Sequence, residues 1–286
     1  MRRNSIRAAA LALLLAAAPA VAAEPPLVLA LIPQENPEKL IGDIAKITGY
    51  LRRELGREVK GYVTQDHAAA VEALAAGKAD VSFMGALPYV LARVRAGAEV
   101  VLSEVYRGKT HYAGAIFVRS DSGISELAQL RGKMIAFADP ISESGYLYPL
   151  ELFVGAKLLD RRQDPHKFFR RVYFAGGYQQ AIQAVANRLV DAAGVSIYAL
   201  LLLAPEQRAL VRSIAETPPI PSHAVIVRKG MNADLREAFV NAMLKLNQPK
   251  FRYLLKHVYN PDGYVRARQA DYDKVADLAR LYGLIK

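Results

Sequence analysis

The stretch Phe137–Pro149, FADPISESGYLYP, gathers small and polar residues between a strand-like apolar run and a helix-like run. A helix start presents unpaired N–H groups and a partial positive charge, which suits a phosphate-like group. Ser142 and Ser144 add hydroxyl donors, Gly145 lets a ligand approach the backbone closely, and Glu143 places a carboxylate among them. The loop therefore predicts a binding site for an oxyanion that also contains a negatively charged side chain, Glu143. Serine and glycine before a helix are also ordinary capping and turn chemistry, and the loop alone leaves both interpretations open.

Three other loops have a similar composition, with small, hydroxyl or amide residues between a predicted strand and a predicted helix. They are LIPQENPEKL after the first predicted strand, FMGALPYV after the third, and FAGGYQQA in the second half of the chain. Ligands of open α/β sheets bind outside the carboxyl ends of the strands. We therefore expect the ligand site where these loops lie.

Short apolar runs alternate with helical periodicity in two rounds along the chain. In the first round, strands are predicted at 27–32, 59–63, 81–84 and 100–105, and helices at 38–55, 68–76 and 88–95. In the second, strands are predicted at 115–119, 134–138, 171–174 and 192–195, and helices at 124–130, 146–159, 179–187 and 197–203. A proline-rich connector at 217–222, a strand at 224–228 and helices at 233–246 and 271–281 complete the prediction. The β-α-β order indicates parallel sheets covered by helices.

The predicted fold class is α/β, with two lobes and a ligand cleft between them. Two similar strands, AGAIFVR and HAVIVRK, bracket the second round, so one lobe is inserted into the other through two crossing strands. The predicted division is a signal peptide at 1–23, lobe 1 at 24–116 and 223–286, and lobe 2 at 117–222.

The first residues have the pattern of an export signal. Arg2, Arg3 and Arg7 form a positive region, Ala8–Ala18 is too short to span a bilayer, and small residues allow cleavage before Ala23 or Glu24. An amphipathic or buried N-terminal helix is the alternative, although no polar face interrupts the run. The chain has no cysteine, which excludes disulfides, a thiol nucleophile and a lipid anchor on cysteine. We predict a soluble protein of the periplasm.

Net charge gives a weak indication of the ligand. The formal charge is +11, and removing the three arginines of the predicted signal peptide lowers it to +8. A basic protein attracts anions, but a basic solvated surface explains the charge equally well. The basic residues are scattered and no nucleic-acid motif is present, so we predict no nucleic-acid partner.

Catalytic patterns are missing from the sequence. Histidines occur singly, without H-x-x-x-H spacing, and no G-x-S-x-G elbow is present. We therefore predict no enzyme activity, no metal and no cofactor, and expect most histidines at the surface or as caps. His111 alone, beside Tyr112, is a candidate for the cleft. The histidines are His67, His111, His166, His223 and His257.

Long segments of the chain also match a known family. They are IPQENPEKL, ALAAGKADVSFMGALPYVLA, HYAGAIFVRSDSGISELAQLRGKMIAFADPISESGYLYP, VYFAGGYQQAIQAV, DAAGVS and ADYDKV. From about Leu27 to Tyr272 the sequence resembles the periplasmic phosphonate/phosphite-binding proteins of ABC importers, which have the type II periplasmic binding-protein fold. The resemblance implies a two-lobe clamp that closes on its ligand and presents it to a membrane permease.

The resemblance also implies which residues of this chain bind ligand. Tyr112 matches the tyrosine that opens the first crossing strand, and Gly85 and Ala86 fall in the facing loop of the first lobe. Ser142, Ser144 and Gly145 match the oxyanion loop.

Three positions of the predicted site depart from the family pattern. Glu143 stands where the family usually has threonine, Tyr178 where a histidine is common, and Ser196 where an acidic residue usually follows. An acid is thus lost from one wall of the predicted site and another is gained elsewhere.

Glu143 can have one of three roles beside a bound anion. Two unit charges about 4 Å apart repel by roughly 4 kcal/mol at an effective dielectric near 20, which is almost a thousandfold in affinity. Glu143 therefore points into solvent, pairs with a cationic group of the ligand, or is neutralised by a basic residue such as Arg107 or Lys109.

The first functional hypothesis is a monomeric periplasmic solute-binding protein that captures a small oxyanion, such as phosphonate, phosphite or phosphate, for an ABC importer. The alternative keeps the fold and makes the protein a ligand-sensing partner of a two-component histidine kinase. An exported enzyme on the same architecture is the third.

Overall fold

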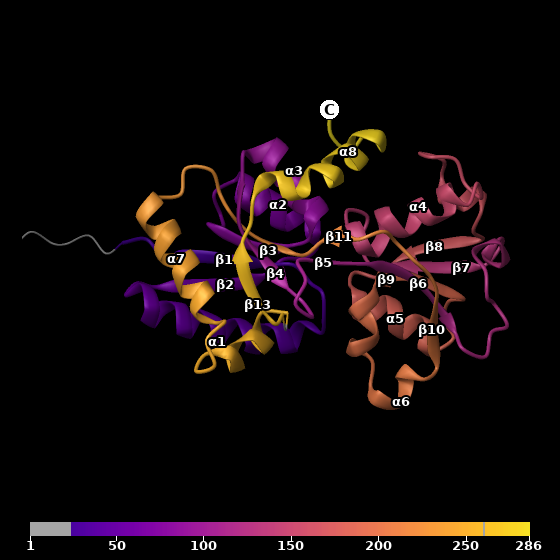
Figure 1. The fold of residues 1–286 in the computed structure, drawn as a ribbon, viewed down its shortest axis with the longest axis horizontal. Coiled ribbons are helices and arrows are strands. Elements are labelled where there is room, and N and C mark those ends of the chain that lie inside the picture. The colour runs from indigo at the N-terminus through magenta and orange to yellow at the C-terminus, as the bar shows by residue number, and fades with distance from the viewer. Residues whose placement is uncertain (1–23, 260) are drawn as a thin grey trace, which may run out of the picture.

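The computed structural model describes residues 24–259 and 261–286. The predicted signal peptide at 1–23 lies outside them. Two α/β lobes stand side by side, each built around one β-sheet (Figure 1). None of the helices in the described part of the chain has the length and apolar character needed to cross a membrane.

The sheet of the first lobe has the strand order β13-β4-β12-β3-β1-β2. Its strands are β1 (Leu27–Leu31), β2 (Val59–Val63), β3 (Val81–Met84), β4 (Glu99–Val105), β12 (Ala224–Val227) and β13 (Gly263–Arg266). β1 pairs in parallel with β2 and β3, as the β-α-β pattern predicts. The late strand β12 runs antiparallel between β3 and β4, so the sheet as a whole is mixed.

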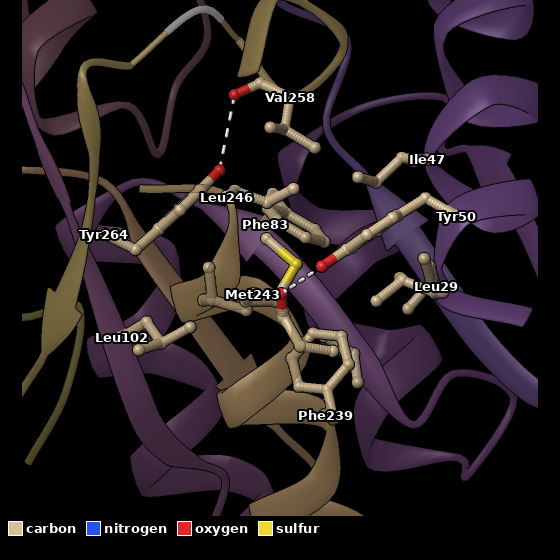
Figure 2. Packing of buried hydrophobic residues seen from close by; sticks show 14 of the residues in the cluster. Leu29, Ile47, Tyr50, Phe83, Leu102, Phe239, Met243, Leu246, Val258 and Tyr264 are labelled. Atoms are coloured by element: carbon tan, nitrogen blue, oxygen red, sulfur yellow. Dashed lines mark hydrogen bonds between the residues drawn. The ribbon is translucent and has the colours of Figure 1, made fainter. Parts of the chain in front are cut away.

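Helices cover both faces of this sheet (Figure 1). They are α1 (Pro37–Leu55) and α7 (Ala233–Lys245) on one face, and α2 (His67–Ala75), α3 (Ala86–Ala96) and α8 (Asp273–Leu281) on the other. Under α1 and α7, Leu29 and Phe83 of the sheet pack against Tyr50, Phe239 and Met243 (Figure 2). The Tyr50 hydroxyl reaches the Ala242 carbonyl at 2.7 Å, so this buried polar group is satisfied.

The sheet of the second lobe has the strand order β10-β6-β9-β7-β8. Its strands are β6 (Gly114–Arg119), β7 (Met134–Phe137), β8 (Arg171–Phe174), β9 (Ala192–Ser196) and β10 (Val211–Glu216). The helices are α4 (Tyr148–Gly155), α5 (Tyr178–Ala186) and α6 (Pro205–Arg208), with α4 and α5 packed on opposite faces. β7 pairs in parallel with β8 and β9, and β6 runs antiparallel to β9.

A short two-stranded ladder, β5 (His111–Tyr112) with β11 (Ile220–Pro221), lies between the two sheets (Figure 1). The sequence predicted AGAIFVR and HAVIVRK as the crossing strands. This is wrong, because β6 pairs wholly within the second sheet and β12 wholly within the first. The proline-rich connector instead supplies β11. The exact lobe limits stay predictions, and the one after residue 116 falls inside β6.

Several predicted elements differ in the structure. The helix predicted at 146–159 is a π-helical turn, η2 (Glu143–Leu147), followed by the shorter α4. The helices predicted at 124–130 and 197–203 are 3₁₀ turns, η1 (Leu127–Leu130) and η4 (Ile197–Leu202), and β10 and β13 were not predicted. The other 3₁₀ turns are η3 (Pro165–Lys167), η5 (Arg252–His257) and η6 (Gln269–Tyr272).

Candidate ligand-binding site

A cavity of about 300 Å³ lies between the lobes. Gln34 after β1, Glu104 on β4 and His223 before β12 come from the first lobe. Tyr178 at the start of α5 and Ser196 at the end of β9 come from the second. Tyr112 of the connecting ladder completes this part of the wall, so both lobes and their connection contribute.

Glu143 lies directly behind that wall and is fully buried. Ser142 caps η2 by accepting the Gly145 N–H at 3.0 Å, and this turn aims the following side chain at the first lobe. The Glu143 carboxylate accepts the Leu87 N–H at 3.2 Å and the Tyr112 hydroxyl at 2.8 Å. The first lobe and the connecting ladder thus bind a buried carboxylate that the second lobe supplies.

The start of α3 is built to receive this carboxylate. Gly85, the cap residue of α3, gives no side-chain capping bond, so the first N–H groups are open to a partner from outside. A Cβ added to Gly85 would lie 2.3 Å from both carboxylate oxygens of Glu143. Only glycine leaves room for the carboxylate at this helix start, where the helix dipole also favours negative charge.

Ser142, Ser144 and Tyr178 form a second polar group beside Glu143. The Tyr178 hydroxyl lies 3.3 Å from Ser142 Oγ and 3.0 Å from Ser144 Oγ. The Tyr112 hydroxyl lies 2.9 Å from Ser144 Oγ. Burial raises the pKa of both tyrosines, and the nearby Glu143 charge raises it further. Both tyrosines therefore keep their protons at neutral pH and can donate hydrogen bonds.

His223 connects this network to the first lobe. Its Nδ1 lies 3.0 Å from the Gln34 amide nitrogen, and its Nε2 lies 3.6 Å from Glu143 and 3.5 Å from Tyr178. Burial lowers the pKa of His223, although the Glu143 charge acts in the opposite direction. A neutral His223 leaves Glu143 without a full positive charge beside it.

Glu104 is a second buried acid, on the other side of the same imidazole. Its carboxylate lies 3.9 Å from His223 Nδ1. Burial raises the pKa of Glu104 to about 8, so the group is mostly protonated at neutral pH. Within the described ranges, no group of three or more His, Asp or Glu side chains is arranged to hold a metal ion.

The family described as "ABC transporter, phosphonate, periplasmic substrate-binding protein" matches residues 29–272, which is most of the chain. The chain belongs to this family. It is a family of transport substrate-binding proteins and not of enzymes. Two sheets in two lobes are the type II periplasmic binding-protein architecture that the sequence predicted.

Individual relatives and structures agree with this placement in the phosphonate-binding family. The chain is 30% identical over 169 residues to the phosphate-import protein PhnD of Mycolicibacterium smegmatis, covering 57% of this chain and 53% of that protein. It is 29% identical over 195 residues to the phosphonates-binding periplasmic protein of Escherichia coli, covering 65% and 56%. The chain therefore spans little more than half the length of these relatives.

A solved structure shows the same fold across nearly the whole chain. It is a binding protein component of an ABC phosphonate transporter from Pseudomonas aeruginosa, with a TM-score of 0.82 and 20% identity. The superposition covers 91% of this chain and 87% of that one.

The structure brings most of the predicted site residues together. Ser142, Glu143, Ser144, Tyr112 and Tyr178 form one hydrogen-bonded group. Of the other predicted residues, Gly85 and Gly145 adjoin this group and Ser196 lines the cavity. Ala86 is buried as the first residue of α3.

Gly145 and Ser196 have structural reasons of their own. A Cβ on Gly145 would lie 2.6 Å from Ala138 Cβ and 2.8 Å from Ser142 Oγ, so packing within the loop already requires glycine. Ser196 caps η4 by accepting the Tyr198 N–H at 3.2 Å, and it also lines the cavity. Each of these residues therefore has a structural role, packing for Gly145 and capping for Ser196, in addition to its place near the site.

Two of the three roles expected for Glu143 are wrong. Its side chain is buried and does not point into solvent. Arg107 and Lys109 do not neutralise it, because both are exposed and the Arg107 guanidinium lies over the rings of Tyr106 and Tyr198. Pairing with a cationic group of a ligand stays a prediction.

Three histidines lie elsewhere than the sequence predicted, whereas His166 is exposed as expected. His67 and His223 are buried near Glu143, whereas His111, the histidine considered for the cleft, is exposed. Gln34 and Glu104 were not predicted. The available signals were a charged residue inside the apolar run of β4 and a polar pair, Ser-His, directly before β12.

Proposed function

We propose that this protein is a periplasmic solute-binding protein that captures a small oxyanion, a phosphonate, phosphite, phosphate or similar, for an ABC importer. The observation that carries the proposal is the cavity between the lobes, whose wall comes from both lobes and from the ladder that joins them. A ligand there contacts both halves at once, so closure of the lobes strengthens its binding. The family and its phosphate-import and phosphonates-binding relatives support the ligand class.

The proposed binding residues combine hydroxyl donors with a helix start. Hydroxyl groups and N–H groups bind oxyanions by donating hydrogen bonds, and the start of α3 adds the positive end of a helix dipole. The proposed residues are Tyr112, Ser142, Ser144, Gly145, Gly85, Ala86, Tyr178 and Ser196. Glu143 is part of the same group, and its carboxylate limits access to the start of α3.

The remaining parts of the proposal follow from the transport role. The signal peptide predicted at 1–23 delivers the chain to the periplasm, where it works as a monomer. The β5–β11 ladder acts as the hinge, and the closed form presents its ligand to the membrane permease. Within the described residues, no observation favours the sensing role with a histidine kinase.

Isothermal titration calorimetry on residues 24–286 tests the proposal. The ligands are methylphosphonate, 2-aminoethylphosphonate, phosphite, phosphate, sulfate and arsenate. We expect saturable one-to-one binding of at least one of them, and loss of that binding in Ser196→Trp, which fills the cavity. If none of the six ligands binds, the oxyanion assignment is refuted. If the protein converts a ligand to product, it is an enzyme and not only a binding protein.

A further inference from the structure

We propose that Glu143 is an internal competitor for the ligand's oxyanion and a latch between the lobes. Its carboxylate holds the place at the start of α3 that the oxyanion must take, and it joins the second lobe to the first. This inference rests on the proposed function, because it concerns the same site.

The surroundings of Glu143 are those of a bound anion. The Leu87 N–H at 3.2 Å and the Tyr112 hydroxyl at 2.8 Å both donate to the carboxylate. These are the two kinds of donor, a helix-start amide and a tyrosine hydroxyl, that the site offers to an oxyanion. In this structure both donors are already bonded to the Glu143 carboxylate.

A ligand oxyanion and the Glu143 carboxylate cannot share this place. At about 4 Å apart their repulsion would weaken binding by roughly a thousandfold at an effective dielectric near 20. His223, 3.6 Å from Glu143, does not offset this repulsion, because burial holds it neutral. The oxyanion therefore binds only when Glu143 leaves, and its measured affinity is reduced by the free energy of removing Glu143.

The same contact joins the lobes. Glu143 lies on η2 of the second lobe, and its carboxylate oxygens face Leu87 and Gly85 of the first. The three atoms nearest to a Cβ added at Gly85 all belong to the Glu143 carboxyl group. Gly85 has φ −71° and ψ 173°, a backbone conformation open to alanine. Alanine at this position therefore meets Glu143 first, which makes Gly85 a probe of the latch from the opposite lobe.

The first experiment measures oxyanion affinity in variants of Glu143. Calorimetry with methylphosphonate and with phosphate compares the wild type with Glu143→Thr, Glu143→Gln and the surface control Glu206→Thr. We expect Glu143→Thr to bind at least about 100-fold more tightly than the wild type. Glu143→Gln, which keeps the size and loses the charge, should lie between them, and Glu206→Thr should match the wild type.

The second experiment needs no ligand. A double-mutant cycle compares Gly85→Ala in the wild type and in Glu143→Thr by thermal unfolding, with small-angle scattering of each variant. We expect Gly85→Ala to lower Tm by about 4 °C in the wild type and by less than about 1 °C in Glu143→Thr, where the shorter side chain leaves room for the added methyl group. In the wild-type background, Gly85→Ala should also increase the radius of gyration, because the latch is broken.

The two experiments separate the two proposals. Equal effects of Gly85→Ala in both backgrounds would overturn the latch, even if the protein binds oxyanions well. Tight oxyanion binding by the wild type with no gain in Glu143→Thr or Glu143→Gln would overturn the competition and leave the proposed function standing. Coupling in the cycle without oxyanion binding by any variant would keep the latch, remove the competition and refute the proposed ligand class.

Discussion

Two buried acids on opposite sides of one imidazole show how surroundings decide what a carboxylate can do. Glu143 receives an N–H from the start of α3 and the Tyr112 hydroxyl. Glu104 faces the same His223 ring from the other side at 3.9 Å, and burial alone raises its pKa to about 8. Burial penalises a charge unless donors replace water. One acid thus has the surroundings of a bound anion, whereas the other remains mostly protonated.

The largest expected effect that distinguishes the two acids is the pH dependence of stability from Glu104. Its pKa in the folded protein is raised to about 8, so the folded state holds a proton that the unfolded state releases above its ordinary pKa near 4.5. Stability is therefore lost as pH rises toward 8. Glu104→Gln removes this loss. The difference in free energy of unfolding between Glu104→Gln and the wild type should therefore shift by about 2 kcal/mol in favour of the variant as pH rises from 6 to 8.

Urea unfolding at several pH values checks this prediction, with Glu206→Gln as the exposed control. The lowered pKa of the buried His67 and His223 gives the opposite slope below about pH 6.5, so the difference between variant and wild type is the quantity to follow. A difference that does not change with pH would show that Glu104 titrates normally.

The next effect compares a tyrosine that donates to the Glu143 carboxylate with a tyrosine near Glu104 that donates to a neutral carbonyl. Tyr112→Phe removes a hydroxyl that donates to the Glu143 carboxylate at 2.8 Å, and hydrogen bonds to charged groups contribute about 1.5–3 kcal/mol. Tyr259, which lines the same cavity as Glu104 and whose pKa burial raises, donates instead to the neutral Ile32 carbonyl at 2.6 Å. Tyr259→Phe should therefore cost less, about 0.5–1.5 kcal/mol.

Urea unfolding at pH 7 compares the two tyrosine variants directly. Equal losses of unfolding free energy in the two variants would mean that the hydrogen bond to the Glu143 carboxylate contributes no more than the bond to the neutral Ile32 carbonyl. A larger cost for Tyr259→Phe would show that the hydroxyl bond to the Glu143 carboxylate is the weaker of the two.

The smallest effect concerns the imidazole between the acids. The Gln34 amide nitrogen can only donate, so His223 Nδ1 accepts at 3.0 Å and Nε2 carries the proton that faces Glu143 and Tyr178. Gln34→Met should cost about 1 kcal/mol and should mix the two tautomers. Nitrogen-15 chemical shifts of the His223 ring report the tautomer, and an unchanged spectrum would show that Gln34 does not fix it.

Much of the fold was predictable because it depends on local pattern. The strands β1, β2 and β3 and the helices between them follow from apolar alternation and helical periodicity in consecutive segments. The position of β12 was not predictable, because it pairs with β3 and β4 from far away in the sequence. The helix predicted from residue 146 fails for a local reason: Ser142 caps a π-helical turn that starts three residues earlier, at Glu143.

The candidate site was predictable as a set of loops but not as a set of contacts. Ser142, Ser144, Tyr112 and Tyr178 were expected at the site and lie within one hydrogen-bonded group. His223 was expected elsewhere, because a single histidine before a strand carries no spacing signal.

The sequence by itself determined the family, the α/β class with two lobes, and a serine- and glycine-containing loop with an unusual acid at its centre. These properties depend on residue types and on spacing along one segment. Only the tertiary structure decided where Glu143 points, because its partners Leu87 and Gly85 belong to the other lobe, more than fifty residues away. A side chain that spans two lobes takes its role from both of them, and one loop alone could not predict it.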